Sequence, residues 1–568
     1  MTDQLTHDQC VLLTVHYASE ANIDVLHALT PSRLDALDPK LVLRILLTYL
    51  PETVHPSLYT TYVREVASRL YLEQKEHLKV DISPVKDISP AQAQKRVKKL
   101  NLLDLVPPSF PPNAPDDLLT RFICFRAARI DKETGRLDLV SDLIVPFLDH
   151  NEWIRTWFIS VVLPLLRFEN EYYPGAAVGK SVDEFSKVDG PEGIDILLAK
   201  VIETEHDAGS EPNGNVARDI KGLVGPWMYG HTDRKRRKLY RTKDDDRRGS
   251  VDSTTRRLGR ISLSGVSAED STGHDWEHVY KWMVDTAAQR FTIVLAAIEE
   301  WDGPGDVDLG GYDDGQRYLA EEVLQKLERQ YAQAIFASVY AAEHDTLDAI
   351  DGAHGVLVRL AHLLDFEPPP DLATSVELLP RIDSHASALI ESDSAHLLEP
   401  HTLLTPDHPL TTPVLETFML LQMFVYSAYL LAGLGQPISI TSVAKLRFYT
   451  SEDEQLVMLQ KVLKGLEKKG KRDESQWAAD RNKLLWLWNW GISAEEEDAQ
   501  KGAGCLGGVA KDVFEKELLR VFVDNSSHND HSTYAGVVED VNPAEHVDSL
   551  AGVEPEELSF PFVEREED

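Results

Sequence analysis

Hydrophobic residues recur at helical spacing along most of the chain, and residues 38–51 show the pattern most clearly. Asp38 suits the N-cap of a helix, and Pro39 suits its first turn. Pro51 ends the segment. Apolar side chains between these points cover nearly the whole helical circumference, which predicts a helix sandwiched between other helices.

The next segment, 56–74, has one apolar stripe instead of an apolar circumference. The residues assigned to the stripe are Leu58, Tyr62, Val66 and Leu70, with Tyr59 and Val63 beside them. The residues assigned to the polar face are Arg64, Glu65 and Arg69. The pattern predicts an amphipathic helix. Fully apolar and one-sided helices joined by proline-marked turns are typical of stacked helix pairs.

The helical pattern continues to the last quarter of the chain. Further helices are predicted over 115–130, 137–148, 154–174, 275–301, 317–342, 345–364, 413–433 and 453–469. The stretch LLWLWNW (484–490) alternates as a strand would, but its helical neighbours favour a helix. No repeat of fixed length is present. The sequence therefore predicts an all-α fold, an irregular and elongated α-solenoid of stacked helix pairs.

The apolar stretch 154–174, IRTWFISVVLPLLRFENEYYP, is too short between its arginines to span a membrane. We expect Pro164 to kink the helix, and Arg155 and Arg167 to bind carboxylates or carbonyls at its ends. The predicted core residues are Trp157, Ile159, Val161, Val162, Leu165 and Leu166.

A second stretch, 417–435, carries no charge over 19 residues, which is close to the length of a membrane span. Its polar members are Gln422, Tyr426, Ser427 and Tyr429, and no basic cluster flanks it. These features favour a buried helix of a soluble protein, while a membrane span stays open as the alternative.

Charge and cysteine content narrow the class of protein. The 94 acidic and 58 basic side chains give a formal net charge of −36, which argues against nucleic acid as the main partner. Cys10, Cys124 and Cys505 lie far apart, so neither a disulfide framework nor a zinc site is predicted. The first residues contain no Lys or Arg and do not resemble a secretory signal. We expect a cytosolic protein or one on the cytosolic face of a membrane.

Two polar regions interrupt the helical pattern. Between 233 and 260 there are 12 basic and five acidic residues, and the wider region is rich in serine, which predicts a disordered loop. Ser250 and Ser262 follow arginine-containing sequences that basophilic kinases recognise. The expected organisation is an N-terminal solenoid segment (1–230), a disordered basic loop (231–274), a C-terminal solenoid segment (275–523) and an acidic tail (524–568).

Motifs for catalysis or cofactor binding fail on spacing or context. GAAVGKS (175–181) has one residue too few between its outer glycines for a phosphate-binding loop, and GAGCLG (502–507) lacks the buried strand that must precede a dinucleotide-binding turn. HDWEH places His274 and His278 one turn apart without a third ligand, and His528 and His531 lie in a polar segment. No catalytic, cofactor-binding or metal residue is predicted, no cofactor is expected, and the binding residues are unknown.

Three long strings resemble one known family. LDPKLVLRILLTYLPETVHPSLYTTYV, DLIVPFLDHNEWIRTWFISVVLPLLRFENEYYP and GLVGPWMYGHTDRKRRKL are similar to the fungal Sec-thirty-nine secretory-pathway family, whose larger animal relative is the neuroblastoma-amplified sequence protein. The similarity is strongest over 8–75, 115–175 and 222–238. From about 275 to 525 it is a matter of helical character.

The resemblance implies a non-enzymatic scaffold in a Dsl-type (NRZ-type) tethering complex at the endoplasmic reticulum (ER), acting in retrograde Golgi-to-ER transport. It implies that other tether subunits and ER SNARE proteins are partners, that the protein is peripheral on the cytoplasmic face of the ER, and that it binds neither nucleic acid nor a small-molecule substrate. Two other hypotheses stay open. One is a helical adaptor with a nuclear or chromatin role that uses the basic loop 233–260, and the other is an unrecognised enzyme.

Overall fold

The structure is a computed structural model. It describes residues 4–71, 80–105, 114–204, 216–229, 275–313, 319–382, 397–468, 474–491 and 501–526. These residues form α-helices with short 3₁₀ and π turns and contain no β-strand. The all-α prediction is confirmed. The basic loop 231–274, with Ser250 and Ser262, lies outside the described residues, as does the tail beyond Ser526.

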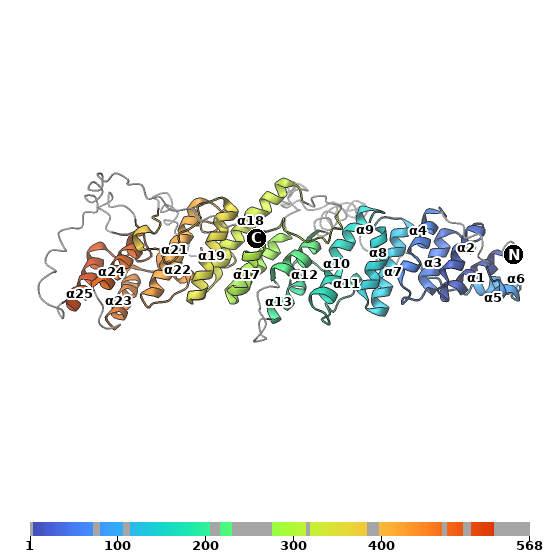
Figure 1. Cartoon of the computed structure of the whole chain (residues 1–568), viewed down its shortest axis with the longest axis horizontal. Helices are drawn as coiled ribbons and strands as arrows, with labels where there is room; N and C mark the ends of the chain where they lie inside the picture. Colours follow the sequence, from blue (N-terminus) through green and yellow to red (C-terminus); the bar gives the residue numbers. More distant parts are fainter. Residues whose placement is uncertain are drawn as a thin grey trace, which may run out of the picture.

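The helices follow one another along the long axis of the molecule in chain order, except at the N-terminal end (Figure 1). Extensive contacts join elements that are close in the chain, for example α1 with α2 and α3, α7 with α8, and α16 with α17 and α18. Each helix therefore buries its apolar side against near neighbours in sequence, as stacked helix pairs do.

The first helices begin where the local sequence places them. They are α1 (His7–Ser19), α2 (Ile23–Ser32), α3 (Pro39–Tyr49) and α4 (Thr60–Ser68). The Asp38 side chain accepts a hydrogen bond from the Lys40 N–H at the start of α3, and Leu43, Ile45, Leu46 and Leu47 are fully buried. The predicted sandwiched helix is confirmed.

The prediction for 56–74 is wrong at both ends and on one face. Leu58 lies in a separate 3₁₀ turn, and α4 ends where Arg69 takes a left-handed conformation with φ 58°. Leu58 and Leu70 are therefore exposed rather than part of the stripe. Glu65 is buried because His27 Nε2 lies 2.5 Å from its Oε2 atom. The pattern within 56–74 could not show this, because the partner, His27, lies on another helix, α2.

Two short helices, α5 (Ser83–Lys86) and α6 (Pro90–Val97), run back to the N-terminal end and pack on α1, so that they form the tip of the molecule (Figure 1). Gln9 donates from Nε2 to the Ile88 carbonyl at 2.7 Å, and the Tyr17 hydroxyl donates to the Asp81 carbonyl at 2.5 Å. These two helices were not predicted from the sequence.

The stretch 154–174 is one buried helical segment with two wide turns. It comprises α9 (Glu152–Trp157), the π turn η4 (Phe158–Val162), α10 (Leu163–Leu166) and the π turn η5 (Arg167–Tyr172). It follows α7 (Leu118–Thr134), α8 (Leu137–Ile144) and η3 (Val145–Phe147). The predicted core is confirmed except at Leu166, which is only partly buried. The two π turns flank Pro164, which cannot donate a backbone hydrogen bond.

Arg167 joins this segment to the middle of the chain. Its guanidinium donates to the Gly222 carbonyl at 2.9 Å and to the Asp308 carbonyl at 2.6 Å, and it pairs with the Asp308 carboxylate at 2.9 Å. Arg155 pairs with Asp149 at 3.3 Å. Both arginines therefore bind carboxylates or carbonyls as predicted. The described elements that follow η5 in the chain are α11 (Val182–Phe185), α12 (Gly190–Leu197), α13 (Ala199–Thr204), α14 (Val216–Asp219) and η7 (Ile220–Val224).

The long helix predicted over 275–301 is two helices. α16 (Trp276–Gln289) and α17 (Phe291–Glu300) are separated at Arg290, whose backbone is not helical, with φ −144° and ψ 73°. The Arg290 side chain donates to the Ile202 carbonyl at 2.6 Å, so a contact with a distant part of the chain accompanies the break. The next helices are α18 (Glu321–Ala341) and α19 (Leu347–Leu364), close to their predicted bounds, and the 3₁₀ turn η8 (Val376–Leu378) follows them.

The C-terminal helices include one strongly apolar helix, α21. They are α21 (Leu415–Gly433), α22 (Ile440–Phe448), α23 (Glu452–Lys468), α24 (Glu474–Asn489) and α25 (Lys511–Ser526). Among the described residues, α21 alone is long and apolar enough to span a membrane, but 72% of its most apolar window is buried. It packs on α19, α22 and α24, which favours the buried-helix interpretation of 417–435. The stretch 484–490 lies mostly in α24, so its assignment as helix is confirmed.

Candidate functional site

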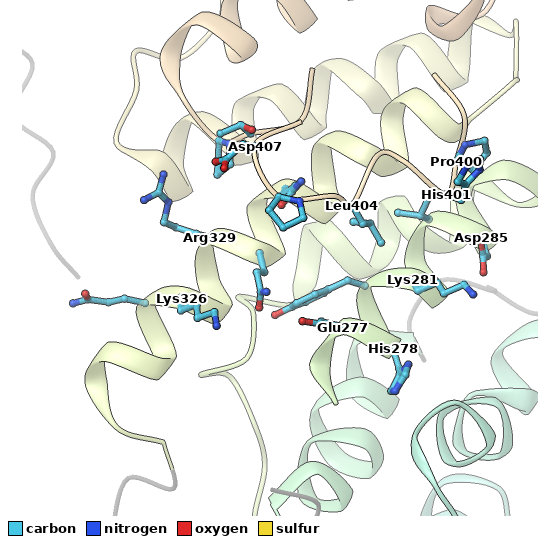
Figure 2. Close-up of a pocket in the computed structure, with 18 of the residues that line it drawn as sticks. Glu277, His278, Lys281, Asp285, Lys326, Arg329, Pro400, His401, Leu404 and Asp407 are labelled. Carbon is cyan, nitrogen blue, oxygen red and sulfur yellow. The ribbon is translucent and has the colours of Figure 1, made fainter. Parts of the chain in front are cut away.

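An open groove of about 1400 Å³ lies between α16, α18 and residues 397–414 (Figure 2). Lys281 and Asp285 lie on one side, and Lys326 and Arg329 lie on the opposite side. The volume exceeds the roughly 300–1,000 Å³ of a typical small-molecule pocket. A groove of this size suits an extended segment or a helix of another protein.

The α16 wall follows from the two faces of that helix. Trp276, Val279 and Met283 are buried against neighbouring helices. Glu277, Lys281 and Asp285 recur every four residues on the groove side. Side chains four apart share one face of a helix, so α16 presents a charged stripe while its apolar side holds it in place.

The α18 wall comes from a helix that is buried over one half only. From Tyr331 to Ala341 nearly every residue is buried, whereas 321–326 are exposed or half-buried. Glu322, Lys326 and Arg329 lie at helical spacing on the groove side. The buried half fixes the helix, and the first turns carry the charged stripe.

The third wall is the non-helical segment 397–414, which Gln333 of α18 binds. Gln333 Nε2 donates to the Thr405 carbonyl at 2.8 Å and to the Leu403 carbonyl at 3.3 Å. Thr411 Oγ1 donates to the Leu403 carbonyl at 2.6 Å. His408 is buried behind this wall, and burial lowers its pKa. The segment therefore offers a fixed surface although it has no regular structure.

The groove carries charges of both signs that the described protein does not pair. Lys281, Lys326 and Arg329 form no ion pair with another described residue, and neither do Asp285, Glu322 and Asp407. Unpaired charges on opposite walls suit a partner segment with alternating charge, and they give specificity through complementarity. The lining contains no cysteine or serine nucleophile beside a base.

The motifs that resembled phosphate-binding turns have other roles. Gly175 and Gly179 adopt positive φ in a turn, and Lys180 pairs with Glu192 at 2.9 Å. In GAGCLG the N–H groups of Gly504 and Leu506 donate to carbonyls at the end of α24, at 2.8 and 3.2 Å. A Cβ on Gly504 would lie 2.1 Å from the Leu487 carbonyl oxygen, so close packing explains that glycine.

The histidines and cysteines form no site among the described residues. His278 packs against Gly190 of α12, where an added Cβ would lie 2.6 Å from its ring. His274, His528 and His531 lie outside the described residues. Cys10, Cys124 and Cys505 are buried free thiols. Within the part of the chain that the structure describes, no three His, Cys, Asp or Glu side chains come together as a metal site requires.

Of the groove residues, only His278 was singled out from the sequence, as part of HDWEH, although a signal for the charged walls was present. Glu277, Lys281 and Asp285 repeat at four-residue spacing, and α18 shows a similar charged stripe. Such stripes are typical of solvated helix faces. Only the contact between α16 and α18, with residues 397–414 across them, turns two ordinary stripes into a groove.

Comparison with known proteins gives one match. A family model described as secretory pathway protein Sec39 matches residues 11–545, which is nearly the whole chain. No curated protein and no solved structure matches.

Proposed function

Because the chain belongs to the Sec39 family of secretory pathway proteins, we propose that it is a non-enzymatic scaffold subunit of a vesicle tethering complex at the ER. Its work is retrograde Golgi-to-ER transport, and its partners are other tether subunits and ER SNARE proteins. It reaches the cytoplasmic face of the ER membrane as a peripheral protein.

The groove between α16 and α18 is the observation that supports a scaffold role most directly. A scaffold needs a preformed surface that is larger than a metabolite site and lined by side chains available to a partner. Lys281, Lys326 and Arg329 meet this requirement, since they are not engaged within the described chain. The elongated array of helices adds length along which several partners bind at once (Figure 1).

Affinity purification of the tagged full chain with mass spectrometry tests this function. We expect tether subunits and SNARE proteins among the recovered partners. The variant Lys281→Glu/Lys326→Glu/Arg329→Glu should lose at least one partner, because reversing three groove charges opposes the complementary surface. The control Lys461→Glu/Lys464→Glu/Lys516→Glu makes the same charge change on exposed positions of α23 and α25 and should keep every partner that the groove binds.

Two results would contradict the proposal. Recovery of chromatin proteins without tether subunits would favour an adaptor that uses the basic loop 233–260. Equal partner recovery by the groove variant and the wild type would mean that the groove is not a binding site.

Membrane extraction tests the peripheral attachment. If α21 is a core helix, alkaline carbonate should release the protein from ER membranes, and depletion of the ER SNAREs should shift it to the cytosol. Retention after carbonate, with release by detergent alone, would mean that 417–435 spans the bilayer.

A further inference from the structure

The N-terminal tip of the molecule carries five exposed basic side chains. We call Lys86, Lys95, Arg96, Lys98 and Lys99 the basic tip. They lie on α5, on α6 and in the turn after α6, at the end of the long axis that Figure 1 labels α5 and α6. The segment 83–99 contains one acidic residue, Asp87, and so has a net charge of +4 in a chain whose formal net charge is −36.

These bases are unpaired, unlike many exposed bases elsewhere. Arg69 pairs with Asp38 at 3.0 Å, Lys187 with Asp183 at 2.7 Å, and Lys445 with Glu343 at 3.1 Å. No member of the basic tip forms an ion pair or side-chain hydrogen bond with a described residue. With 94 acidic side chains in the protein, five unpaired bases in one place need an explanation.

Helix stability explains only part of the cluster. Lys95 and Arg96 lie in the last turn of α6, where a positive charge interacts favourably with the carbonyl end of the helix. That effect is small and fades beyond the last turn. It does not account for Lys86 on a different helix.

The packing of α6 directs its polar side away from the protein. Ala93 is fully buried where α6 packs on α1, and Val97 is half-buried. Every other residue from 90 to 99 is exposed. No large apolar side chain between residues 80 and 100 is exposed, so the tip offers positive charge without an apolar anchor.

We propose that the basic tip binds the surface of an anionic membrane. Four of its five bases are lysines, which act as hydrated point charges and do not demand the fixed geometry that an arginine fork gives. Protein interfaces obtain most of their affinity from aromatic and other anchors in desolvated pockets. A charged surface without such anchors instead complements a diffuse layer of anionic headgroups, and clusters of four to eight basic residues are typical of lipid-binding segments.

Because salt screens distant charges, the charge close to the membrane surface decides whether the tip binds. At physiological salt the Debye length is about 8 Å, so acidic side chains farther away along the molecule repel the membrane only weakly. The tip therefore approaches an anionic surface while the acidic body stays away from it. The molecule then stands with its N-terminal end on the membrane. This proposal does not depend on the tethering role.

Vesicle flotation with the full chain tests the proposal. The vesicles are phosphatidylcholine alone, or phosphatidylcholine with about 30% phosphatidylserine. We expect binding to the anionic vesicles only, with a strong decrease as salt is raised. Lys95→Gln/Arg96→Gln/Lys98→Gln/Lys99→Gln should lower the partition coefficient by tenfold or more, since each well-placed base contributes about fivefold.

The matched control is Lys461→Gln/Lys464→Gln/Lys511→Gln/Lys516→Gln, which removes the same charge from exposed positions at the opposite end of the molecule. It should bind as the wild type does. A circular dichroism melt of each variant excludes unfolding as the cause.

Three outcomes would overturn the proposal. The first would be a wild type that does not bind anionic vesicles. The second would be a tip variant that binds as well as the wild type, while neutralising the bases of 233–260 abolishes binding. The third would be a tip variant that keeps vesicle binding but loses an acidic protein partner, which would make the tip a protein-binding site.

Discussion

The two ends of the chain secure their helices by different chemistry. All three arginines that are buried in the described structure, Arg33, Arg126 and Arg167, occur in the first third of the chain. Arg126 donates to the carbonyls of Leu50 and Pro51 at 2.8 and 2.6 Å. These carbonyls lie directly after α3, where the helix leaves its last acceptors without an internal partner. One guanidinium thus satisfies two carbonyls and pins α7 to the end of α3.

The part of the chain after residue 220 uses aromatic side chains instead. Eight of the ten tryptophans follow residue 220. Trp490 is fully buried at the end of α24, donates from Nε1 to Ser427 Oγ at 3.0 Å, and lies with its ring centroid 5.5 Å from that of Phe424. Trp488 donates to the Val509 carbonyl at 2.9 Å and stacks on Phe514.

The difference shows what each region depends on. A buried guanidinium stabilises only while its acceptors and carboxylates surround it, because an unpaired buried charge is costly. An indole brings apolar area together with one donor, so most of its contribution survives the loss of the hydrogen bond. The N-terminal region should therefore be sensitive to charge, and the C-terminal region to volume.

The largest effect should come from a charge placed where no partner exists. Trp157 is 6% exposed and its Nε1 has no hydrogen-bond partner in the described structure. Trp157→Asp should lower the free energy of unfolding by several kcal/mol and reduce the yield of soluble protein. Denaturant unfolding measures this, with Trp157→Phe as the mild control. Normal folding with loss of a partner alone would make Trp157 an exposed anchor.

Removal of a buried guanidinium should have the next largest effect. Arg126→Ala leaves the carbonyls of Leu50 and Pro51 unsatisfied and empties a fully buried site, while Glu52 keeps Arg129 as a partner at 2.8 Å. We expect a loss of about 3–5 kcal/mol in unfolding free energy, from two unsatisfied carbonyls and the cavity. Arg136→Ala, which breaks the exposed pair with Asp138, should cost far less, because water screens an exposed ion pair. Equal costs for the two variants would mean that the N-terminal region does not depend on its buried guanidinium groups.

A buried carboxylate should make the middle of the molecule sensitive to pH. Burial raises the pKa of Asp219 to about 6, although Tyr173 and Arg218 bond its carboxylate. The pKa of an unfolded aspartate is about 3.9, so between about pH 4 and pH 6 the folded state holds a proton that the unfolded state has released. Stability contributed by this group is therefore full below pH 4 and falls as pH rises, by at most about 3 kcal/mol.

Asp219→Asn should remove this part of the pH dependence. Unfolding curves of the wild type and the variant, measured from pH 4 to pH 7, give the difference in their free energies of unfolding. The contributions of the other acidic groups are the same in both proteins and cancel in this difference. A difference that does not change with pH would show that Asp219 titrates normally in the folded protein.

The smallest effect should come from the hydrogen bond of a buried indole. Trp490→Phe keeps most of the ring area and removes the donor to Ser427, so we expect a loss of about 1–2 kcal/mol. Ser427→Ala removes this acceptor and the hydroxyl's own bond to the Met423 carbonyl, and it should cost less because the ring packing is retained. A larger cost for Ser427→Ala would mean that the C-terminal region depends on its polar contacts and resembles the N-terminal one.

The sequence by itself determined most of the helical elements and much of the core. Asp38, Pro39 and Pro51 set the bounds of α3, since caps and prolines act on residues within one turn. Helical spacing identified the buried side of 154–174 for the same local reason. The charged stripes of α16 and α18 were also visible, but they show only which residues share a face.

Tertiary structure decided which faces meet. The return of α5 and α6 to α1, the burial of Glu65 by His27 and the break at Arg290 all depend on contacts between residues far apart in the chain. The groove belongs to the same class, as does the position of the basic tip at the end of the molecule. Periodicity reports the neighbours of a residue within about four positions, whereas a groove exists only when separate segments are brought together. Which segments come into contact follows from the free energy of packing all the helices together.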